Sequence, residues 1–425
     1  MNEMLLQFIW KSQYFNKTEL ETTNGEPLQI IYPGLQNTHQ GPDFKDARIV
    51  CNGIKFAGSI ELHLAASEWK VHGHEKDDFY KNVVLHVVWS NDVENPENKI
   101  PVLELSSRIS NKMLSQYKEW MLSANFIPCQ EQLPDVNELH RNSWLQRLWV
   151  ERMERKSDML KEDLKATHNH WEQLLWWQIA RYFGAMVNTD AFEAIMKSIP
   201  FTVLSRHKNQ IHQLEALLLG QSGLLPVHND DPYLKMLASE YQFLADKYKL
   251  QKPHVQIYQL RMRPGNFPAV RLAQLAMLFH LNDRLFSRIL EMDAPMDVMK
   301  LFDVTANDFW SYHFTLKTSG KYDPKRTGRQ LAETLLLNAV IPVLFAHRLE
   351  HDGYKMEQQL MRWMGEVRPE KNSILNDFAH FGWVAENAMH SQALLELKNH
   401  YCDRFRCLEC AIGCNLLKKQ LDLTV

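Results

Sequence analysis

The hydrophobic pattern of this 425-residue chain changes its period once, near residue 130, and this change constrains the fold more than any other feature. Before it, one short amphipathic segment beginning at Met4 is followed by short β-type runs that turn clusters separate. After it, apolar residues recur with the 3.6-residue period of helices, first around Trp144 and Leu148. The sequence therefore predicts two domains: an α+β domain over residues 1–125 and a larger all-α domain over residues 135–425.

The first domain is expected to contain one helix and a mixed sheet of about five strands. The β-type runs are Leu28–Tyr32, Ala47–Cys51, Lys55–Leu64, Val83–Trp89 and Ile100–Leu105. Between the second and third runs stands the pair Asn52-Gly53, which is a strong signal for a two-residue hairpin. These two strands should therefore be antiparallel neighbours, and their pairing should bring Asp43 close to Glu61.

The second domain is expected to be helical throughout, without a fixed-period repeat. Its helical stretches are Trp171–Tyr182, Ile211–Leu219, Tyr233–Tyr248, Ala269–Phe279, Gln330–Arg348 and His390–His400.

Composition excludes several classes of protein. A net charge of −3 and a pI near 6.7 exclude a globally basic nucleic-acid binder, so any polyanion site must be local. The chain has no uninterrupted run of about 18 apolar residues, and its first residues lack the pattern of a signal peptide. We therefore expect a cytoplasmic protein without a membrane span. The sequence gives no indication of its oligomeric state.

The residues with the clearest chemical meaning are Asp43, Glu61 and His63. Side chains alternate along a strand, so Glu61 and His63 should share one face. A hard divalent cation needs converging carboxylate oxygens, which Asp43 and Glu61 could supply to Mg²⁺. His63 would then lie beside the metal, where it could activate a water or stabilise charge on a phosphate.

This pattern resembles the PD-(D/E)xK nuclease superfamily, with Pro42-Asp43 and Glu61-Leu62-His63 at the motif positions. The resemblance implies a magnesium-dependent phosphodiesterase that acts on nucleic acid, with Asp43 and Glu61 as metal ligands. His63 stands where lysine is usual in that superfamily. Residues 1–125 hold 12 Lys and Arg against 16 Asp and Glu, a net of −4 that disfavours polyanions unless bound cations offset it.

Over its whole length the chain also resembles an uncharacterised bacterial family, number 2851 among the domains of unknown function. The segments that carry this resemblance are Gly41–Phe44, Trp69–His74, Arg263–Ala276 and Cys407–Gly413. It brings no established activity, and it implies that the chain is one recurrent unit.

Two other functions remain open. His63, His72, His74 and His86 offer enough imidazole, with Glu61, for a zinc- or manganese-dependent hydrolase of a small molecule, and His39 is a further candidate ligand. In the simpler interpretation His86 is a hydrogen-bonded core histidine. The other alternative is a non-catalytic, nuclease-like scaffold that binds a partner through its helical domain.

A basic segment in the second domain is a candidate site for the substrate backbone. Arg261 and Arg263 precede a helix that carries Arg271, and guanidinium groups near a helix N-terminus can bind phosphate. A structural turn whose arginines pair with acids is the alternative interpretation.

Four of the six cysteines fall within 13 residues near the C-terminal end, in the pattern Cys402-x4-Cys407-x2-Cys410-x3-Cys414. Such clustering indicates either a structural zinc site or an iron–sulfur cluster, and His400 could replace one thiol. Ordinary packing of small buried thiols is the third interpretation.

Overall fold

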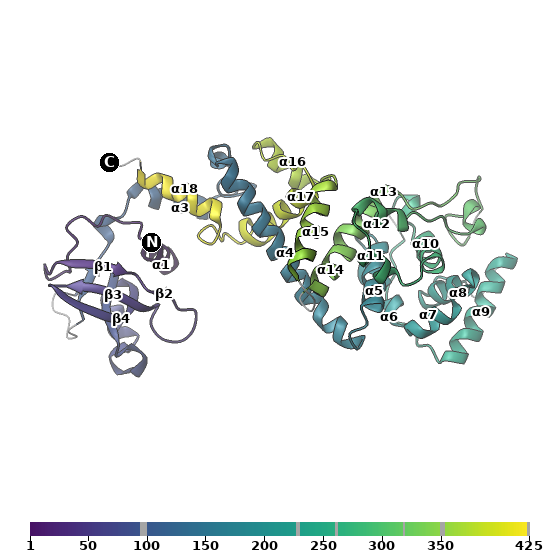
Figure 1. Ribbon diagram of the computed structural model, residues 1–425, viewed down its shortest axis with the longest axis horizontal. Coiled ribbons are helices and arrows are strands. Elements are labelled where there is room, and N and C mark those ends of the chain that lie inside the picture. Colours follow the sequence, from purple (N-terminus) through teal and green to yellow (C-terminus); the bar gives the residue numbers. More distant parts are fainter. Residues whose placement is uncertain (94–99, 227–229, 260–261, 318, 349–352, 423–425) are drawn as a thin grey trace. The chain divides into compact units, whose positions relative to one another are not determined.

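The computed structural model describes residues 1–93, 100–226, 230–259, 262–317, 319–348 and 353–422 (Figure 1). The chain divides into two compact units. The first comprises residues 1–144, 376–384 and 395–425, and the second comprises residues 145–375 and 385–394. Residues 395–425, which we expected to belong with the helical domain, thus group with the N-terminal part of the chain.

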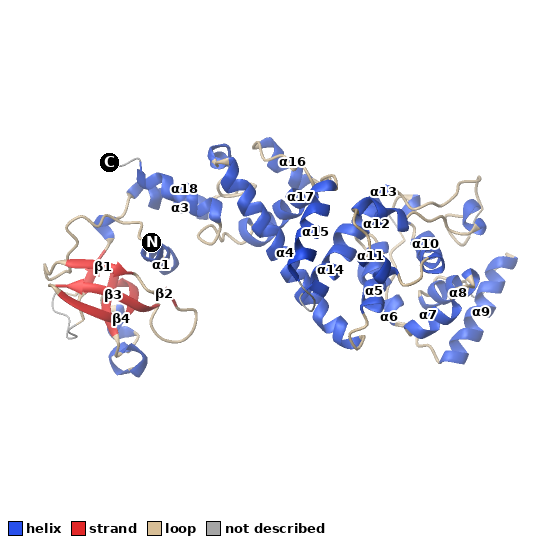
Figure 2. Cartoon of the chain, in the orientation of Figure 1, coloured by secondary structure: helices blue, strands red, loops and turns tan. Residues whose placement is uncertain are grey.

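The first unit contains a mixed sheet with helices, and every strand in the described part of the chain belongs to it (Figure 2). The strands follow the order β1-β3-β4-β5-β6, and the short β2 pairs with β3. Their bounds are Leu28–Tyr32 for β1, Leu35–Gln36 for β2, Phe44–Cys51 for β3, Ile54–Ala65 for β4, Val83–Ser90 for β5 and Val102–Glu104 for β6. The predicted α+β fold class is confirmed, with β2 as the one strand that the sequence pattern did not reveal.

The hairpin between β3 and β4 forms at the predicted turn. Cys51 pairs with Ile54, and both Asn52 (φ 48°) and Gly53 (φ 76°) have positive φ, as a type I′ turn requires. From this turn the antiparallel register runs to the pair Phe44 and Ile60. The register therefore places Asp43, the residue just before β3, opposite Glu61.

Strand β4 is central in the sheet, because it also pairs in parallel with β5. The parallel connection is a crossover that contains helix α2 (Glu68–Val71) and two short 3₁₀ turns, His74–Lys76 and Asp78–Tyr80. Both faces of β4 are buried over residues 58–63, whereas its first four residues are exposed. Ile60 and Leu62 are fully buried on one face, and the polar residues Glu61 and His63, at 6% and 2% exposure, are buried on the other.

Helix α1 (Glu3–Ser12) also packs against β4. The side chain of Asn2 caps its first turn by accepting a hydrogen bond from the backbone N–H of Leu5 (2.8 Å). The helix buries the apolar side chains Leu5, Leu6, Phe8, Ile9 and Trp10. The remaining helices of this unit are α3 (Asn111–Leu122) and α18 (Ala411–Asp422), which pack against each other.

The second unit is helical. The division between the units falls within α4 (Glu138–Ala166), α16 (Ser373–His380) and α17 (Ala388–Glu396). The helices that lie wholly in the second unit are α5 (Trp171–Phe183), α6 (Thr189–Lys197), α7 (Phe201–His207), α8 (Ile211–Gln221), α9 (Pro232–Tyr248), α10 (Pro268–Leu281), α11 (Leu285–Leu290), α12 (Pro295–Leu301), α13 (Arg329–Leu335), α14 (Ile341–Arg348) and α15 (Gly353–Glu366).

One stretch of this unit was expected as the single helix Gln330–Arg348. It forms α13 and α14 joined by a π-helical turn at Leu336–Val340. Within the described residues, Arg329–Arg348 is the stretch whose length and apolar composition would allow it to cross a membrane, and 67% of the window concerned is buried inside the protein. Because a core helix meets the same two criteria, this is weak evidence for a span.

A candidate metal centre on the central strand

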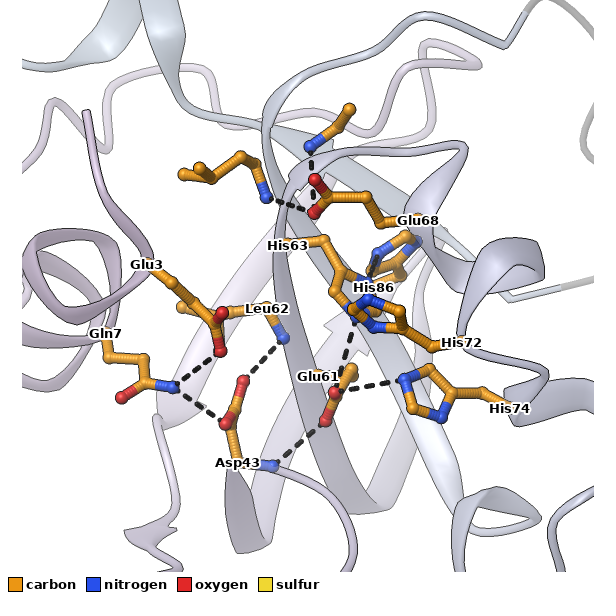
Figure 3. A network of polar contacts seen from close by, with 12 residues as sticks. Glu3, Gln7, Asp43, Glu61, Leu62, His63, Glu68, His72, His74 and His86 are labelled. Carbon is orange, nitrogen blue, oxygen red and sulfur yellow. Dashed lines mark hydrogen bonds and ion pairs between the residues drawn. The ribbon is translucent and has the colours of Figure 1, made fainter.

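The carboxylates of Asp43 and Glu61 are neighbours held by backbone hydrogen bonds (Figure 3). The backbone N–H of Asp43 donates to Oε2 of Glu61 (3.0 Å), and the backbone N–H of Leu62 donates to Oδ2 of Asp43 (3.0 Å). The amide of Gln7, on α1, donates to the other Asp43 oxygen (2.8 Å). The predicted closeness of Asp43 and Glu61 is confirmed, and the hairpin register is its cause.

The other oxygen of Glu61 faces imidazole rings. Its Oε1 lies 3.6 Å from Nε2 of His63 and 3.5 Å from Nε2 of His74. One ring nitrogen each of His63, His72 and His74 lies within 4.8 Å of the other two, so that they could hold a metal ion. We call Glu61, His63, His72 and His74 the histidine–carboxylate cluster.

Each histidine of the cluster comes from a different local element. His63 is on β4, His72 is the C-terminal cap of α2, and His74 begins the 3₁₀ turn that follows. The crossover therefore covers the polar face of β4 with two imidazoles. Trp69 on α2 contacts the ring of His63 edge-on, with 6.5 Å between the ring centroids, and that of His74 at 5.4 Å.

Two neighbouring side chains fix the orientation of the imidazoles. Nε2 of His86 on β5 lies 2.8 Å from Nδ1 of His63, in a hydrogen bond whose donor depends on the tautomer. The ring of Tyr80 stacks on His74, with 3.8 Å between the centroids. His86 is 2% exposed and bonded to another ring, so it is the core histidine of the simpler interpretation.

Burial shifts the ionisation of these groups away from their charged forms. Burial raises the pKa of Asp43 to about 7, and burial together with the Asp43 charge raises the pKa of Glu61 to about 8. Burial and the neighbouring histidines lower the pKa of His63 to about 3, and burial and His74 lower that of His86 to about 4. The rings of His63 and His86 are therefore neutral near pH 7, which is the form in which imidazole binds metals.

One nitrogen atom in the cluster lacks the partner that buried polar atoms normally have. Among the described residues, Nε2 of His74 is buried and makes no hydrogen bond. Nε2 of His63 and Nδ1 of His72 lie 3.2 Å apart, in a hydrogen bond whose donor depends on the tautomer. A cation beside Glu61 would give Nε2 of His74 a partner and could also bind the other two rings.

Other candidate residues lie elsewhere. His39 is exposed, and its described hydrogen bonds are between its backbone and the side chain of Asn37. In the second unit, Arg263 is exposed, whereas Arg271 is bonded to Asn266 (2.5 Å) and Gln274 (3.0 Å), and burial lowers its pKa to about 10. Arg261 lies outside the described residues. Substrate binding by these arginines stays a prediction.

The structure adds site residues that the sequence did not single out. Gln7 bonds to Asp43, and Tyr80 and Trp69 hold the imidazoles. In the sequence, aromatic residues and histidines are dense between Trp69 and Tyr80, and this density could have indicated that the segment contributes to a site. Local spacing alone could not show that this segment folds back over β4.

The fold and cluster define the class of protein: an α+β unit with a buried histidine–carboxylate cluster on the central strand of its sheet, joined to a helical unit. A family model described as "Protein of unknown function (DUF2851)" matches residues 3–373. The chain therefore belongs to the DUF2851 family. Searches of curated proteins and of solved structures found no match.

Proposed function

We propose that the first unit is a metal-dependent hydrolase of phosphodiester bonds, with nucleic acid as its class of substrate. One observation carries the proposal: a single oxygen of Glu61 lies 3.5–3.6 Å from two imidazole nitrogens, beside a third imidazole. Ligand atoms about 2.0–2.2 Å from a tetrahedral zinc ion lie roughly 3.3–3.6 Å apart. The spacing of these donors therefore fits one transition-metal ion.

The type of donor also bears on which metal binds. Three imidazoles and one carboxylate suit Zn²⁺ or Mn²⁺ better than Mg²⁺, which prefers oxygen ligands in an octahedron. The proposed ligands are Glu61, His63, His72 and His74. A divalent cation held there would polarise a phosphoryl oxygen and lower the pKa of a water molecule.

The remaining residues position this ligand set. The backbone N–H of Asp43 holds one oxygen of Glu61 so that the other faces the rings. The carboxylate of Asp43 accepts from the backbone N–H of Leu62 and thereby fixes the residue next to Glu61, a contact that Asp43→Ala removes. His86 fixes the ring of His63 from behind, as a partner of a metal-bound imidazole commonly does. Tyr80 limits the rotation of His74 by stacking on it. These contacts set the geometry before substrate binds, which lowers the cost of reaching the transition state.

The choice of a phosphodiester rests on where the carboxylates stand in the fold. Asp43 precedes one strand and Glu61-x-His63 lies on the adjacent strand, which is the arrangement that the resemblance to PD-(D/E)xK nucleases implies. In the proposed reaction the oxygen of water bonds to phosphorus, one P–O ester bond breaks, and the departing alkoxide takes a proton. The products are a phosphomonoester and an alcohol.

The test is a cleavage assay with the full chain. Labelled single-stranded DNA, double-stranded DNA and RNA are incubated with Zn²⁺, Mn²⁺ or Mg²⁺, alongside bis(p-nitrophenyl) phosphate as a generic phosphodiester. We expect cleavage that Glu61→Gln and His63→Ala abolish and that Asp43→Ala reduces. His39→Ala is the matched control, because it removes an exposed imidazole outside the cluster, and it should retain full activity.

The assay also separates the alternatives. Cleavage of the chromogenic diester without cleavage of any nucleic acid would favour a small-molecule hydrolase. Absence of cleavage with every metal, in protein whose circular dichroism shows it folded, would favour the non-catalytic scaffold. Cleavage that survives Glu61→Gln and His63→Ala would remove the cluster from the reaction.

A further inference from the structure

A second group of metal-binding side chains lies in the first unit, where four cysteines come together from distant parts of the chain. Cys129 follows α3, Cys402 ends a π-helical turn that begins at Leu397, Cys407 is in the next loop, and Cys410 immediately precedes α18. Cys129 and Cys402 are thus separated by more than half of the sequence. Cys129, Cys407 and Cys410 are all buried.

Packing within the first unit explains this convergence. Helices α3 and α18 lie side by side, although one is near residue 115 and the other near residue 415 (Figure 1). The ammonium group of Lys419 donates to the carbonyl of Asp135 (2.6 Å), and the indole of Trp383 donates to that of Leu133 (3.2 Å). The segment that carries Cys129 is therefore anchored against the C-terminal residues.

Gly413 allows the loop of Cys407 to approach α18. A Cβ atom at residue 413 would lie 2.3 Å from the carbonyl oxygen of Cys407, closer than any real contact allows. The loop thus folds tightly over the first turn of α18, and this brings Cys407 beside Cys410. The guanidinium of Arg406 donates to the carbonyl of His400 (3.2 Å), which fastens the same loop to the residues around Cys402.

The thiols form a set of four mutual neighbours. Every one of the six pairs among Cys129, Cys402, Cys407 and Cys410 is close enough for a charge on one sulfur to raise the pKa of the other. Cys414 shows this effect only with Cys407 and Cys410, and its S–H donates to the carbonyl of Leu408 (3.1 Å). Cys129, Cys402, Cys407 and Cys410 are therefore mutual neighbours, and Cys414 is a neighbour of two of them.

The spacing of the sulfur atoms bears on whether the four thiols would bind one metal ion or a larger iron–sulfur cluster. Four thiolates about 2.3 Å from one tetrahedral zinc ion lie about 3.8 Å apart. In the described part of the chain, the histidine cluster alone brings three ligand atoms within 4.8 Å of one another. No three of the four described sulfur atoms therefore lie within 4.8 Å of one another, whereas one zinc ion would hold all four about 3.8 Å apart. A cubane of four iron and four sulfide atoms needs this wider arrangement of four thiolates.

We propose that Cys129, Cys402, Cys407 and Cys410 are the four ligands of a [4Fe–4S] cluster. The cluster fastens residues 395–425 to the segment after α3, within the first unit. This set differs from the one expected from sequence spacing, because Cys129 takes the place of Cys414. The inference is independent of the histidine–carboxylate cluster and of the reaction proposed there.

The test is to purify the full chain without oxygen, or to reconstitute it with Fe²⁺ and sulfide, and then to measure iron, acid-labile sulfide and zinc. We expect about four iron and four sulfide per chain, with broad visible absorption that oxidation bleaches. Cys129→Ser should lose this absorption and most of the iron. Cys51→Ser, which changes a buried cysteine on β3 outside the group, and Cys414→Ser should keep both.

Two results would overturn the proposal. One is wild-type protein that binds zinc or no metal when iron and sulfide are supplied, a measurement that does not depend on whether any variant folds. The other is a Cys129→Ser protein that keeps its absorption and iron content. Circular dichroism of each variant shows whether loss of iron accompanies loss of helices.

Discussion

Two buried glutamates, one in each unit, have similarly perturbed pKa values but different surroundings. Burial raises the pKa of Glu61 to about 8 and that of Glu215, on α8, to about 7. Glu215 accepts hydrogen bonds from the hydroxyl of Tyr233 (2.7 Å), the amide of Asn307 (2.8 Å) and the indole of Trp310 (3.1 Å). Its oxygens are satisfied by neutral donors of the protein itself.

Glu61 has such a donor on one oxygen only. Its Oε1 faces imidazole nitrogens at 3.5–3.6 Å, which is longer than a good hydrogen bond. A raised pKa therefore does not by itself distinguish a functional carboxylate from a structural one. The neighbours differ: protein donors complete the bonding of Glu215, whereas one oxygen of Glu61 faces imidazole nitrogens that could hold a metal ion beside it.

The largest effect should come from substituting the two glutamates in the same way. Glu61→Gln removes the one carboxylate of the proposed ligand set, so phosphodiesterase activity should fall about 1,000-fold or more. Glu215→Gln should leave activity within about twofold, because the change lies in the other unit and keeps a side chain of the same size. Initial rates on the same substrate check both variants. An equal loss of activity in the two would contradict the proposal that Glu61 binds the metal and Glu215 does not.

The stability of the second unit should fall as pH rises because of Glu215. Its pKa is about 7 in the folded protein and about 4.5 when unfolded, so between these values the native state binds more protons. The stabilisation is complete below pH 4.5 and is lost through pH 7, with a total of about 3 kcal/mol. Urea unfolding of wild type and Glu215→Gln at a series of pH values measures it.

In Glu215→Gln this contribution should vanish, because the amide does not titrate and the hydroxyl of Tyr233 can rotate to accept from it. The unfolding free energy of the variant minus that of the wild type should therefore increase from pH 5 to pH 8, because only the wild type loses stability over this range. A difference that stays constant over this range would show that Glu215 does not titrate there.

A smaller effect should follow from changing the residue behind His63. His86→Leu removes the hydrogen bond to Nδ1 of His63 and should weaken metal affinity about 10- to 100-fold. His86→Gln, which keeps a hydrogen-bonding group in this place, should recover part of the loss. Competition with a chromogenic zinc chelator measures both affinities, and equal affinities for His86→Leu and wild type would contradict a positioning role.

The smallest effect concerns one donor to Glu215. Tyr233→Phe removes the hydroxyl that bonds to Oε2 of Glu215, which should cost about 1 kcal/mol of unfolding free energy. The cost should be greater at pH 8 than at pH 5, since the ionised carboxylate needs the donor more. Activity should not change. A larger loss at pH 5 would reverse the assigned protonation of Glu215.

The sequence predicted those parts of the fold that depend on local signals. The pair Asn52-Gly53 fixed the hairpin register, and the register brought Asp43 to Glu61. Strand alternation placed Glu61 and His63 on one face. The two-residue strand β2 escaped notice because so short a pairing leaves no periodic pattern.

What the sequence did not predict depends on contacts between distant segments. The crossover after β4 turns His72 and His74 back over Glu61, and no local pattern specifies this path. Spacing indicated the quartet Cys402, Cys407, Cys410 and Cys414, because a sequence shows which cysteines are close along the chain and not which are close in space. The packing of α3 against α18 brings Cys129 close to Cys402, Cys407 and Cys410.

The central claim is that the histidine–carboxylate cluster binds one divalent transition-metal ion. Crystals of the protein soaked with Zn²⁺ and measured across the zinc absorption edge test it directly. We predict one anomalous peak about 2.0–2.2 Å from Oε1 of Glu61 and from ring nitrogens of His63, His72 and His74. The claim would be contradicted by the absence of a peak there, or by a peak held by Asp43 and Glu61 without the imidazoles.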